Sequence, residues 1–214
     1  PIADPSILGV NTGAAFFVVC GIAFFHISTA GQYIVFALAG AMLAAIAVYS
    51  IGSMGRGGAT PIKLVLSGTA VSAALSSLIS AILLPRSYVL DQYRFWQVGS
   101  VGSGTIHGIL TFSPLLAAGF VIALLCAPAL NALALGDEAA TGLGVHTKTL
   151  RLTAAAGGVL LCGSTTALAG PIGFIGLLAP HIMRLLLGSN LRLTIPLSAL
   201  AGAVILTIAD VIGR

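Results

Sequence analysis

The stretch from Leu152 to Pro180 contains no charged residue, and it constrains the fold more than any other feature of the sequence. A transmembrane helix needs about 20 apolar residues, so the stretch is too long for one ordinary span. Ala169, Gly170 and Pro171 lie inside it, where glycine relaxes the backbone and proline can open a new helix. We therefore expect two membrane spans joined by a tight hairpin at these residues.

The second arm of this hairpin carries small, kinking and basic residues. Gly173 and Gly176 would let a neighbouring backbone approach closely, and Pro180 would loosen a turn just before His181 and Arg184. We expect His181 to be a buried hydrogen-bonding residue at this break rather than a ligand. The simpler alternative is a glycine-rich packing helix that ends in a basic anchor.

The composition excludes a water-soluble domain. Only 7% of the 214 residues are charged and 58% are hydrophobic, with a mean hydropathy of +1.12. A soluble domain carries about 25% charged residues. The sequence therefore predicts an integral membrane protein of the all-α class, a polytopic transmembrane helical bundle. A net charge of +4 without a Lys/Arg run argues against nucleic-acid binding.

Seven apolar segments with uncharged central portions predict seven spans in a single transmembrane domain over residues 1–214. They are Ile7–Phe25, Tyr33–Ile51, Leu64–Leu84, Ile109–Ala129, Leu152–Ala169, Ile172–Leu187 and Thr194–Gly213. Alternating loops place Arg56, Lys63, Lys148, Arg151, Arg184 and Arg192 on one face, and Arg86, Arg94 and Arg214 on the other. The first face is expected to be cytoplasmic, because cytoplasmic loops carry more Lys and Arg.

The outer loop over residues 85–108 is longer than a connection needs, and it is rich in aromatic residues. Its aromatic side chains fit an interfacial helix lying along the membrane surface, with Arg86, Asp91 and Arg94 facing water. The alternative is an aromatic belt with no specific role.

The inner loop over residues 131–151 has a different character. Asp137 and Glu138 open a short segment, and Gly142 and Gly144 break it. Gly136 to Thr149 is therefore expected to form two very short helices at an angle, offering a surface for another protein.

Motifs for catalysis are missing from the sequence. It contains no GxxxxGK[ST] phosphate loop, HExxH or GxSxG, and its four histidines lie on different predicted elements without metal-ligand spacing. We therefore expect no enzyme activity, no metal site and no cofactor bound by this chain. An ion-coupled carrier would need an ionisable group near the membrane centre, and the predicted spans have none there. Asp210 is better explained by a local ion pair with Arg214.

Several ordered stretches resemble one known family. They are Pro1–Gly9, Asp91–Ser100, Ala132–Ala140 with Leu143–Gly144, Gly170–Gly188 and Ala209–Arg214. Together they resemble the FecCD-type permeases of bacterial ABC importers, which carry iron-siderophores, haem or cobalamin.

The resemblance implies a ten-span permease of the bacterial inner membrane. Such permeases work as homodimers or paired subunits, with two cytoplasmic ATPase subunits that bind ATP and Mg²⁺ and a binding protein outside. The present chain would supply about the third to ninth helices, with two upstream helices and the last helix outside it. The implied activity is ATP-driven import by alternating access, with siderophore, haem and cobalamin all open as cargo.

The resemblance also assigns roles to residues. ATPase coupling would fall to Gly136, Asp137, Glu138, Ala139, Ala140, Leu143, Gly144 and His146. Binding-protein docking would fall to Arg214, with Arg94 and Arg86 as further candidates. The cytoplasmic gate would lie near Ile2, Thr60, Pro61 and Ile62, and Leu64–Leu84 would line the pathway with its dimer mate. Other hypotheses are an ion-coupled secondary transporter of a small solute and a membrane scaffold that transports nothing.

Overall fold

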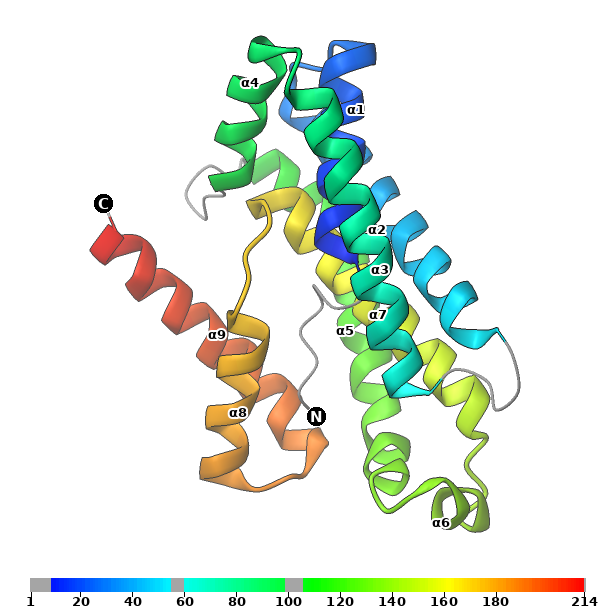
Figure 1. Cartoon of the computed structure of the whole chain (residues 1–214). Helices are drawn as coiled ribbons and strands as arrows, with labels where there is room; N and C mark the ends of the chain where they lie inside the picture. Colours follow the sequence, from blue (N-terminus) through cyan, green and yellow to red (C-terminus); the bar gives the residue numbers. More distant parts are fainter. Residues whose placement is uncertain (1–8, 55–59, 99–105, 214) are drawn as a thin grey trace. The chain divides into compact units, whose positions relative to one another are not determined.

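The computed structural model describes residues 9–54, 60–98 and 106–213, and within these ranges every regular element is a helix (Figure 1). The helices are α1 (Val10–Phe25), α2 (Ala30–Ser53), α3 (Pro61–Leu83), α4 (Ser87–Val98), α5 (Ile106–Leu133), α6 (Asp137–Gly142), α7 (Thr147–Ala169), α8 (Ile175–Leu187) and α9 (Leu191–Gly213). The predicted all-α class is therefore confirmed.

Five of the described helices are long and apolar enough to cross a bilayer, namely α2, α3, α5, α7 and α9. The apolar helices α1 and α8 are shorter, at 16 and 13 residues. At 1.5 Å per residue α8 extends about 20 Å, less than the ~30 Å of a bilayer core. Each of the seven predicted spans thus contains a helix, but two of these helices fall short of a full crossing.

Polar side chains fix where some helices begin. The backbone N–H of Thr29, just before α2, donates to Oε1 of Gln32 at 3.2 Å, which completes a capping box. Before α9, Oδ1 of Asn190 accepts from the backbone N–H of Arg192 at 3.1 Å. Each bond satisfies a donor that the first turn of a helix leaves without a partner.

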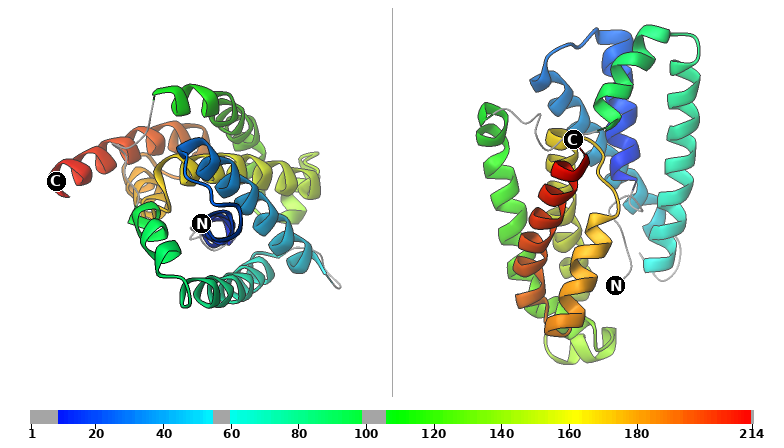
Figure 2. Two further views of the ribbon diagram at one scale, coloured as in Figure 1. Left: turned by 90° about the horizontal axis from the view of Figure 1, so that it is seen from above. Right: turned by 90° about the vertical axis from the view of Figure 1, so that its left-hand side faces the viewer.

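The chain divides into two compact units, Pro1–Phe112 with Cys162–Gly173, and Ser113–Leu161 with Phe174–Arg214. In the first unit α1 contacts α2, α3 and α4, and Figure 2 shows it end-on among them. Val18 and Val19 of α1 are fully buried. A Cβ added to Gly13 would lie 2.5 Å from the carbonyl oxygen of Gly40, so two glycines set the close crossing of α1 and α2.

The second unit is also built on small-residue contacts. A Cβ added to Gly119 of α5 would lie 3.1 Å from the carbonyl oxygen of Gly157 in α7. The antiparallel helices α8 and α9 pack together where Ile175 and Ala179 face Gly202. Close packing of this kind stabilises helix pairs in lipid, where the hydrophobic effect between helices is weak.

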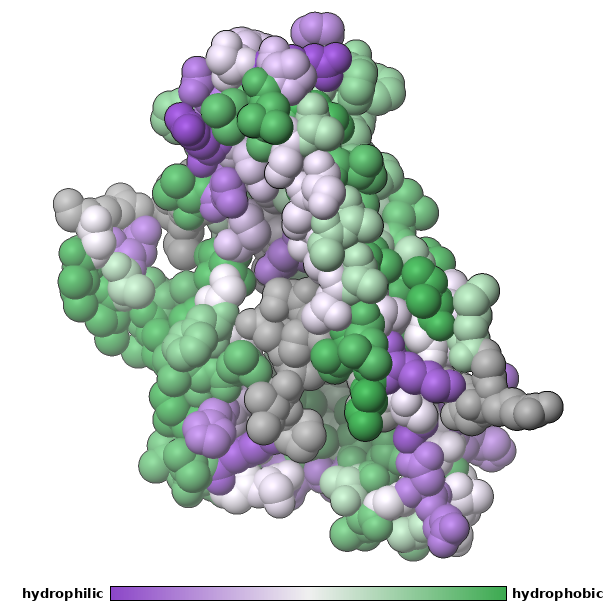
Figure 3. All heavy atoms as spheres, in the orientation of Figure 1, coloured by the Kyte–Doolittle hydropathy of each residue, from purple (hydrophilic) through white to green (hydrophobic). Residues whose placement is uncertain are grey.

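Large apolar side chains are exposed on α9. Leu200, Val204, Ile208, Val211 and Ile212 are each more than half exposed. Figure 3 shows hydrophobic side chains over α8 and α9, whereas hydrophilic ones gather over α6. Soluble proteins rarely expose so many large apolar side chains along one helix. The surface of α9 therefore fits contact with lipid or with neighbouring membrane helices.

The predicted break at Ala169, Gly170 and Pro171 is confirmed, but the second helix does not open at Pro171. Gly170 ends α7 with a φ of 81°, but residues 171–174 are not helical and α8 begins only at Ile175. Phe174 has a φ of 72°, and its carbonyl accepts from the backbone N–H of Leu178 at 3.0 Å. The helix therefore starts after Phe174 rather than at Pro171, because a left-handed residue cannot continue a right-handed helix.

Two further expectations for this arm do not hold among the described residues. A Cβ added to Gly173 would meet nothing within 4 Å, so no backbone approaches it closely. His181 is exposed rather than buried, whereas Ala179, two residues earlier, is the buried residue of α8 against α9. Pro180 and Arg184 lie inside α8 as expected, with Arg184 in its last turn.

Candidate functional site

The inner loop contains a helix whose start is set by Gly136 and two acids. Gly136 has a φ of 113°, and its carbonyl accepts from the backbone N–H of Ala140 at 3.0 Å. Asp137 and Glu138 occupy the first turn of α6, where negative charge favours the exposed N–H groups. The predicted short helix at these acids is thus confirmed, over Asp137–Gly142.

The end of α6 is a Schellman turn. Gly144 has a φ of 80°, and its N–H donates to the carbonyl of Thr141 at 2.9 Å. The N–H of Val145 donates to the carbonyl of Ala140 at 3.0 Å. These two bonds satisfy carbonyls at the helix end and require a left-handed residue, which glycine adopts without strain.

The expected second short helix is not separate. Residues from Thr147 onward form the first turns of α7, and Leu150 N–H donates to the carbonyl of His146 at 3.0 Å. Leu150 is buried, so the first turns of α7 already have a packed face. The helix of the apolar span begins already at Thr147, because residues 147–152 include no glycine or proline that would interrupt it.

An ion pair joins α6 to α7. One guanidinium nitrogen of Arg151, Nη2, lies 2.7 Å from Oδ1 and 2.9 Å from Oδ2 of Asp137. The side chains are 35% and 58% exposed, so water weakens the attraction but does not remove it. The sequence prediction assigned Asp137 to a partner protein and missed this contact within the chain.

The exposed surface of the loop combines two large apolar side chains with polar ones. Ala140 is fully buried, whereas Leu135 and Leu143 are 73% and 67% exposed. Glu138 is exposed as well, and with Asp137, Thr141 and Gly142 it lines a hollow of about 440 Å³. Exposed leucines beside a carboxylate fit contact with another protein.

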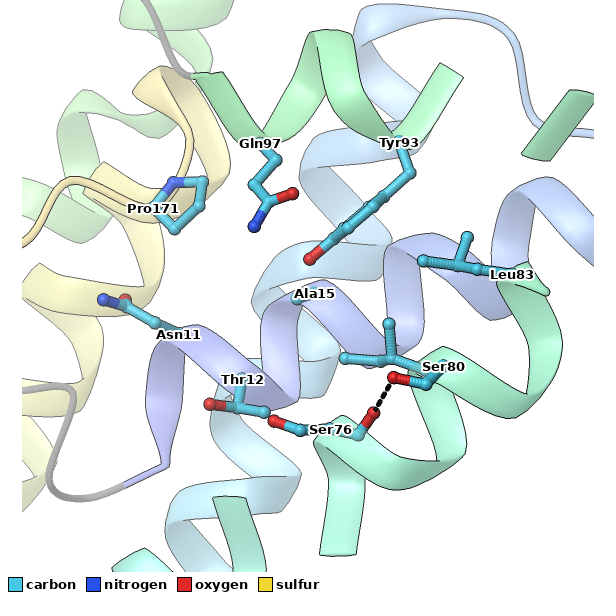
Figure 4. A pocket seen from close by; sticks show the side chains of 10 residues that line it. Asn11, Thr12, Ala15, Ser76, Ser80, Leu83, Tyr93, Gln97 and Pro171 are labelled. Atoms are coloured by element: carbon cyan, nitrogen blue, oxygen red, sulfur yellow. Dashed lines mark hydrogen bonds between the residues drawn. The ribbon is translucent and has the colours of Figure 1, made fainter. Parts of the chain in front are cut away.

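In the first unit, α1, α3 and α4 enclose a polar pocket of about 390 Å³ (Figure 4). It is lined by Asn11, Thr12, Ala15, Ser76, Ile79, Ser80, Leu83, Tyr93, Gln97 and Pro171. Asn11 Oδ1 accepts from Thr166 Oγ1 at 2.9 Å, and Ser80 Oγ donates to the Ser76 carbonyl at 3.0 Å. The lining offers neutral hydrogen-bonding groups and no charge.

Tyr93 directs its hydroxyl into this pocket, as Figure 4 shows. It is 7% exposed, and burial raises the pKa of the phenol above its ordinary value of 10.0. The hydroxyl therefore remains a neutral donor at physiological pH. Sequence reasoning counted Tyr93 among the aromatic side chains of an interfacial helix and missed the pocket, although serines at positions 72, 76 and 80 mark one polar stripe on α3.

Two of the three predicted docking arginines, Arg86 and Arg94, lie at or beside α4. The predicted helix in the outer loop is confirmed at Ser87–Val98. The guanidinium carbon of Arg86 lies 4.9 Å from the ring centroid of Phe24, a cation–π arrangement. Arg94 Nη1 lies 3.8 Å from Asp91 Oδ1, with both side chains mostly exposed. Arg214, and with it the expected ion pair to Asp210, lies outside the described residues.

The residues expected near the gate form the start of α3. Thr60 precedes the helix, and its Oγ1 accepts from the backbone N–H of Lys63 at 3.4 Å. Pro61 occupies the first turn, where its missing N–H costs nothing. Ile62 is 73% exposed. Ile2 lies outside the described residues, so this group is placed only in part.

The fold and the loop together define a class, a multi-pass helical membrane protein with a compact exposed loop between two of its long helices. The family follows from comparison, since residues 1–214 match the model of the FecCD transport family. The chain belongs to this family.

Named relatives of the chain are transport permeases. It is 44% identical over its whole length to the ferric enterobactin transport system permease protein FepD of Escherichia coli (strain K12), and spans 64% of that protein. The probable siderophore transport system permease protein YfiZ of Bacillus subtilis (strain 168) is 41% identical, with 64% spanned. The cobalamin import system permease protein BtuC of Halobacterium salinarum is 35% identical, with 58% spanned.

A solved structure has the same fold. It is an inward-facing conformation described as a metal-chelate type ABC transporter, with a TM-score of 0.87 and 27% sequence identity. The similarity covers 98% of this chain and 67% of that chain. The present chain thus spans between 58% and 67% of the length of these proteins.

Proposed function

We propose that the chain is the central part of a membrane permease subunit in an ATP-driven importer of ferric siderophores at the bacterial inner membrane. Haem and cobalamin are the other cargo classes that the family admits. The observation that carries the proposal is the α6 loop, in which a rigidly capped helix exposes Leu135, Leu143 and Glu138. Family membership and the names of the relatives support the cargo class.

The partners follow from the same proposal. Two cytoplasmic ATPase subunits bind ATP and Mg²⁺ and engage α6, and a second permease subunit completes the pathway. A binding protein delivers the cargo from outside and docks through Arg214, Arg94 and Arg86. The exposed side chains of Arg86 and Arg94 suit acidic groups on that protein.

The pathway is proposed to follow α3. Thr69, Ala73 and Ser77 are exposed on this helix, and they recur about once per turn. A face of small and hydroxyl-bearing side chains can line a channel for a bulky chelate without binding it tightly. ATP-driven closure of the ATPases would move α6 and turn the attached helices, which exposes the channel to alternate sides.

A reconstituted system tests the proposal. Proteoliposomes contain the full-length permease, its ATPase subunits and its binding protein loaded with a ferric siderophore. We expect uptake to require internal ATP and to stop with an ATPase variant that binds but does not hydrolyse ATP. Glu138→Lys should lower uptake and binding-protein-stimulated hydrolysis together, by about tenfold or more, because a reversed charge at an interface is strongly unfavourable.

The contrary result is equally clear. Uptake that continues without the ATPase and follows an ion gradient would overturn the importer proposal in favour of an ion-coupled secondary transporter. Haem and cobalamin, offered as competing cargo, identify the substrate class. A cargo that alone stimulates hydrolysis through its binding protein is the transported one.

A further inference from the structure

We infer that Asp137 and Arg151 form an internal strut that fixes the angle between α6 and α7, and that Glu138 is the acid that faces the ATPase. The inference rests on the proposed function, because it assumes that α6 receives the movement of the ATPase. Of the two neighbouring acids, Asp137 is then a positioning residue and Glu138 is a contact residue.

The first argument is the place of the ion pair. Asp137 is the first residue of α6, at the end of the helix farthest from the connecting turn. Arg151 lies in the second turn of α7. The Schellman turn at Gly144 joins the two helices at one end, and the ion pair of 2.7 and 2.9 Å joins them at the other end of α6, where the chain arrives from α5. Two helices fixed at both ends keep their mutual angle.

The second argument is the direction of the neighbouring side chains. Successive residues on a helix are rotated by about 100°, so Asp137 and Glu138 point in different directions. Asp137 turns toward Arg151, and Glu138 remains exposed. Thr141 Oγ1 donates to the backbone carbonyl of Asp137 at 2.7 Å, which further fixes the first turn.

The mechanical consequence follows from these contacts. A force on α6 reaches α7 only if the angle between the helices is kept. Without the ion pair, α6 can swing on its turn and absorb part of the movement. The Asp137–Arg151 pair is therefore expected to set how much transport each hydrolysed ATP yields, and Glu138 to set how well the ATPase binds.

The test separates assembly from coupling in the full-length importer. Asp137→Asn and Arg151→Gln each remove the charge pair, and Glu138→Gln is the matched neutralisation one residue away. Two quantities are measured: the fraction of permease that copurifies with the ATPase, and the number of chelates imported per ATP hydrolysed. A third readout is the distance distribution between spin labels at the exposed positions Ala139 and Lys148.

We expect Asp137→Asn and Arg151→Gln to assemble normally, to broaden the label distances, and to lower import per ATP about two- to fivefold, the scale of a partly exposed ion pair. The double variant Asp137→Arg with Arg151→Asp should recover most of the loss. Glu138→Gln should weaken assembly and leave the label distances unchanged.

Other outcomes overturn the inference. Unchanged label distances or unchanged import per ATP in Asp137→Asn would refute the strut, and so would a double variant no better than the single ones. Weakened assembly in Asp137→Asn would make Asp137 a direct contact and leave the proposed function standing. If none of these variants, Glu138→Gln included, changed assembly or import, the proposed role of the loop would fail as well.

Discussion

At the scale of single residues, the crossing of α1 and α2 depends on the absence of two side chains. A Cβ on Gly40 would clash with the backbone of Gly13 and lie 2.7 Å from the Cβ of Phe17. Backbone atoms cannot move aside as a flexible side chain can, so the neighbouring helix would have to shift. The surrounding residues Val18 and Ala37 are fully buried and leave no room for such a shift.

Gly40→Leu is therefore expected to destabilise the protein by about 1–3 kcal/mol or more, as overpacking does in other close-packed sites. The measurement is the melting temperature of the purified full-length permease in detergent. Gly31→Ala is the control in the same helix, because a Cβ there meets nothing within 4 Å. It should leave the melting temperature unchanged or raise it slightly through helix propensity. Equal melting temperatures for Gly40→Leu and wild type would refute the close crossing.

At the scale of elements, two asparagines join the end of α5 to the turn between α8 and α9. Asn131 Nδ2 donates to Asn190 Oδ1 at 3.0 Å, and Asn131 Oδ1 accepts from the backbone N–H of Leu191 at 3.1 Å. The α8–α9 pair is thus connected to the helix that leads into α6. A movement of the α6 loop could therefore pass through these hydrogen bonds to the α8–α9 pair, which lies in the same unit.

Asn131→Ala should release this connection. We expect the backbone amide of Leu191 to exchange its hydrogen about fivefold faster, since a net hydrogen bond contributes about 1 kcal/mol. Hydrogen exchange followed by mass spectrometry gives the rate for the peptide that contains this amide. Thr207→Ala is the matched control, because its hydroxyl donates to the carbonyl of Ala203 in its own helix. No acceleration in Asn131→Ala, or the same acceleration in both variants, would contradict the connection.

At the scale of the whole molecule, the distribution of positive charge sets the orientation in the membrane. The loops predicted to lie inside carry more Lys and Arg than those outside, and cytoplasmic loops follow that rule. Arg94 is mostly exposed on α4, and Arg192 is exposed at the start of α9. These two positions are predicted to face opposite sides of the membrane.

Labelling with a membrane-impermeant maleimide tests this orientation. Arg94→Cys and Arg192→Cys are introduced separately into a full-length permease whose native cysteines, Cys20, Cys126 and Cys162 in this chain, are replaced. In intact spheroplasts we expect label on Arg94→Cys only, and in inverted vesicles on Arg192→Cys only. The reverse pattern would place α6 outside, away from any cytoplasmic ATPase.

The sequence by itself determined the class of fold and the positions of the helices. An apolar segment of span length must satisfy its own backbone hydrogen bonds in lipid, so a local property of the chain decides where the helices lie. The same local reasoning located the helix that Asp137 opens and the one in the outer loop. The family resemblance could also be recognised from the sequence, because its motifs are local runs of residues whose order does not depend on tertiary packing.

Only the tertiary structure decided which polar groups meet. Asn11 and Thr166 stand 155 positions apart and still share a hydrogen bond, and no local pattern predicts such a pair. The start of α8 after Phe174 and the pairing of Asp137 with Arg151 were likewise beyond sequence reasoning. Side-chain partners depend on how elements pack in space, whereas the helices themselves depend on neighbours along the chain.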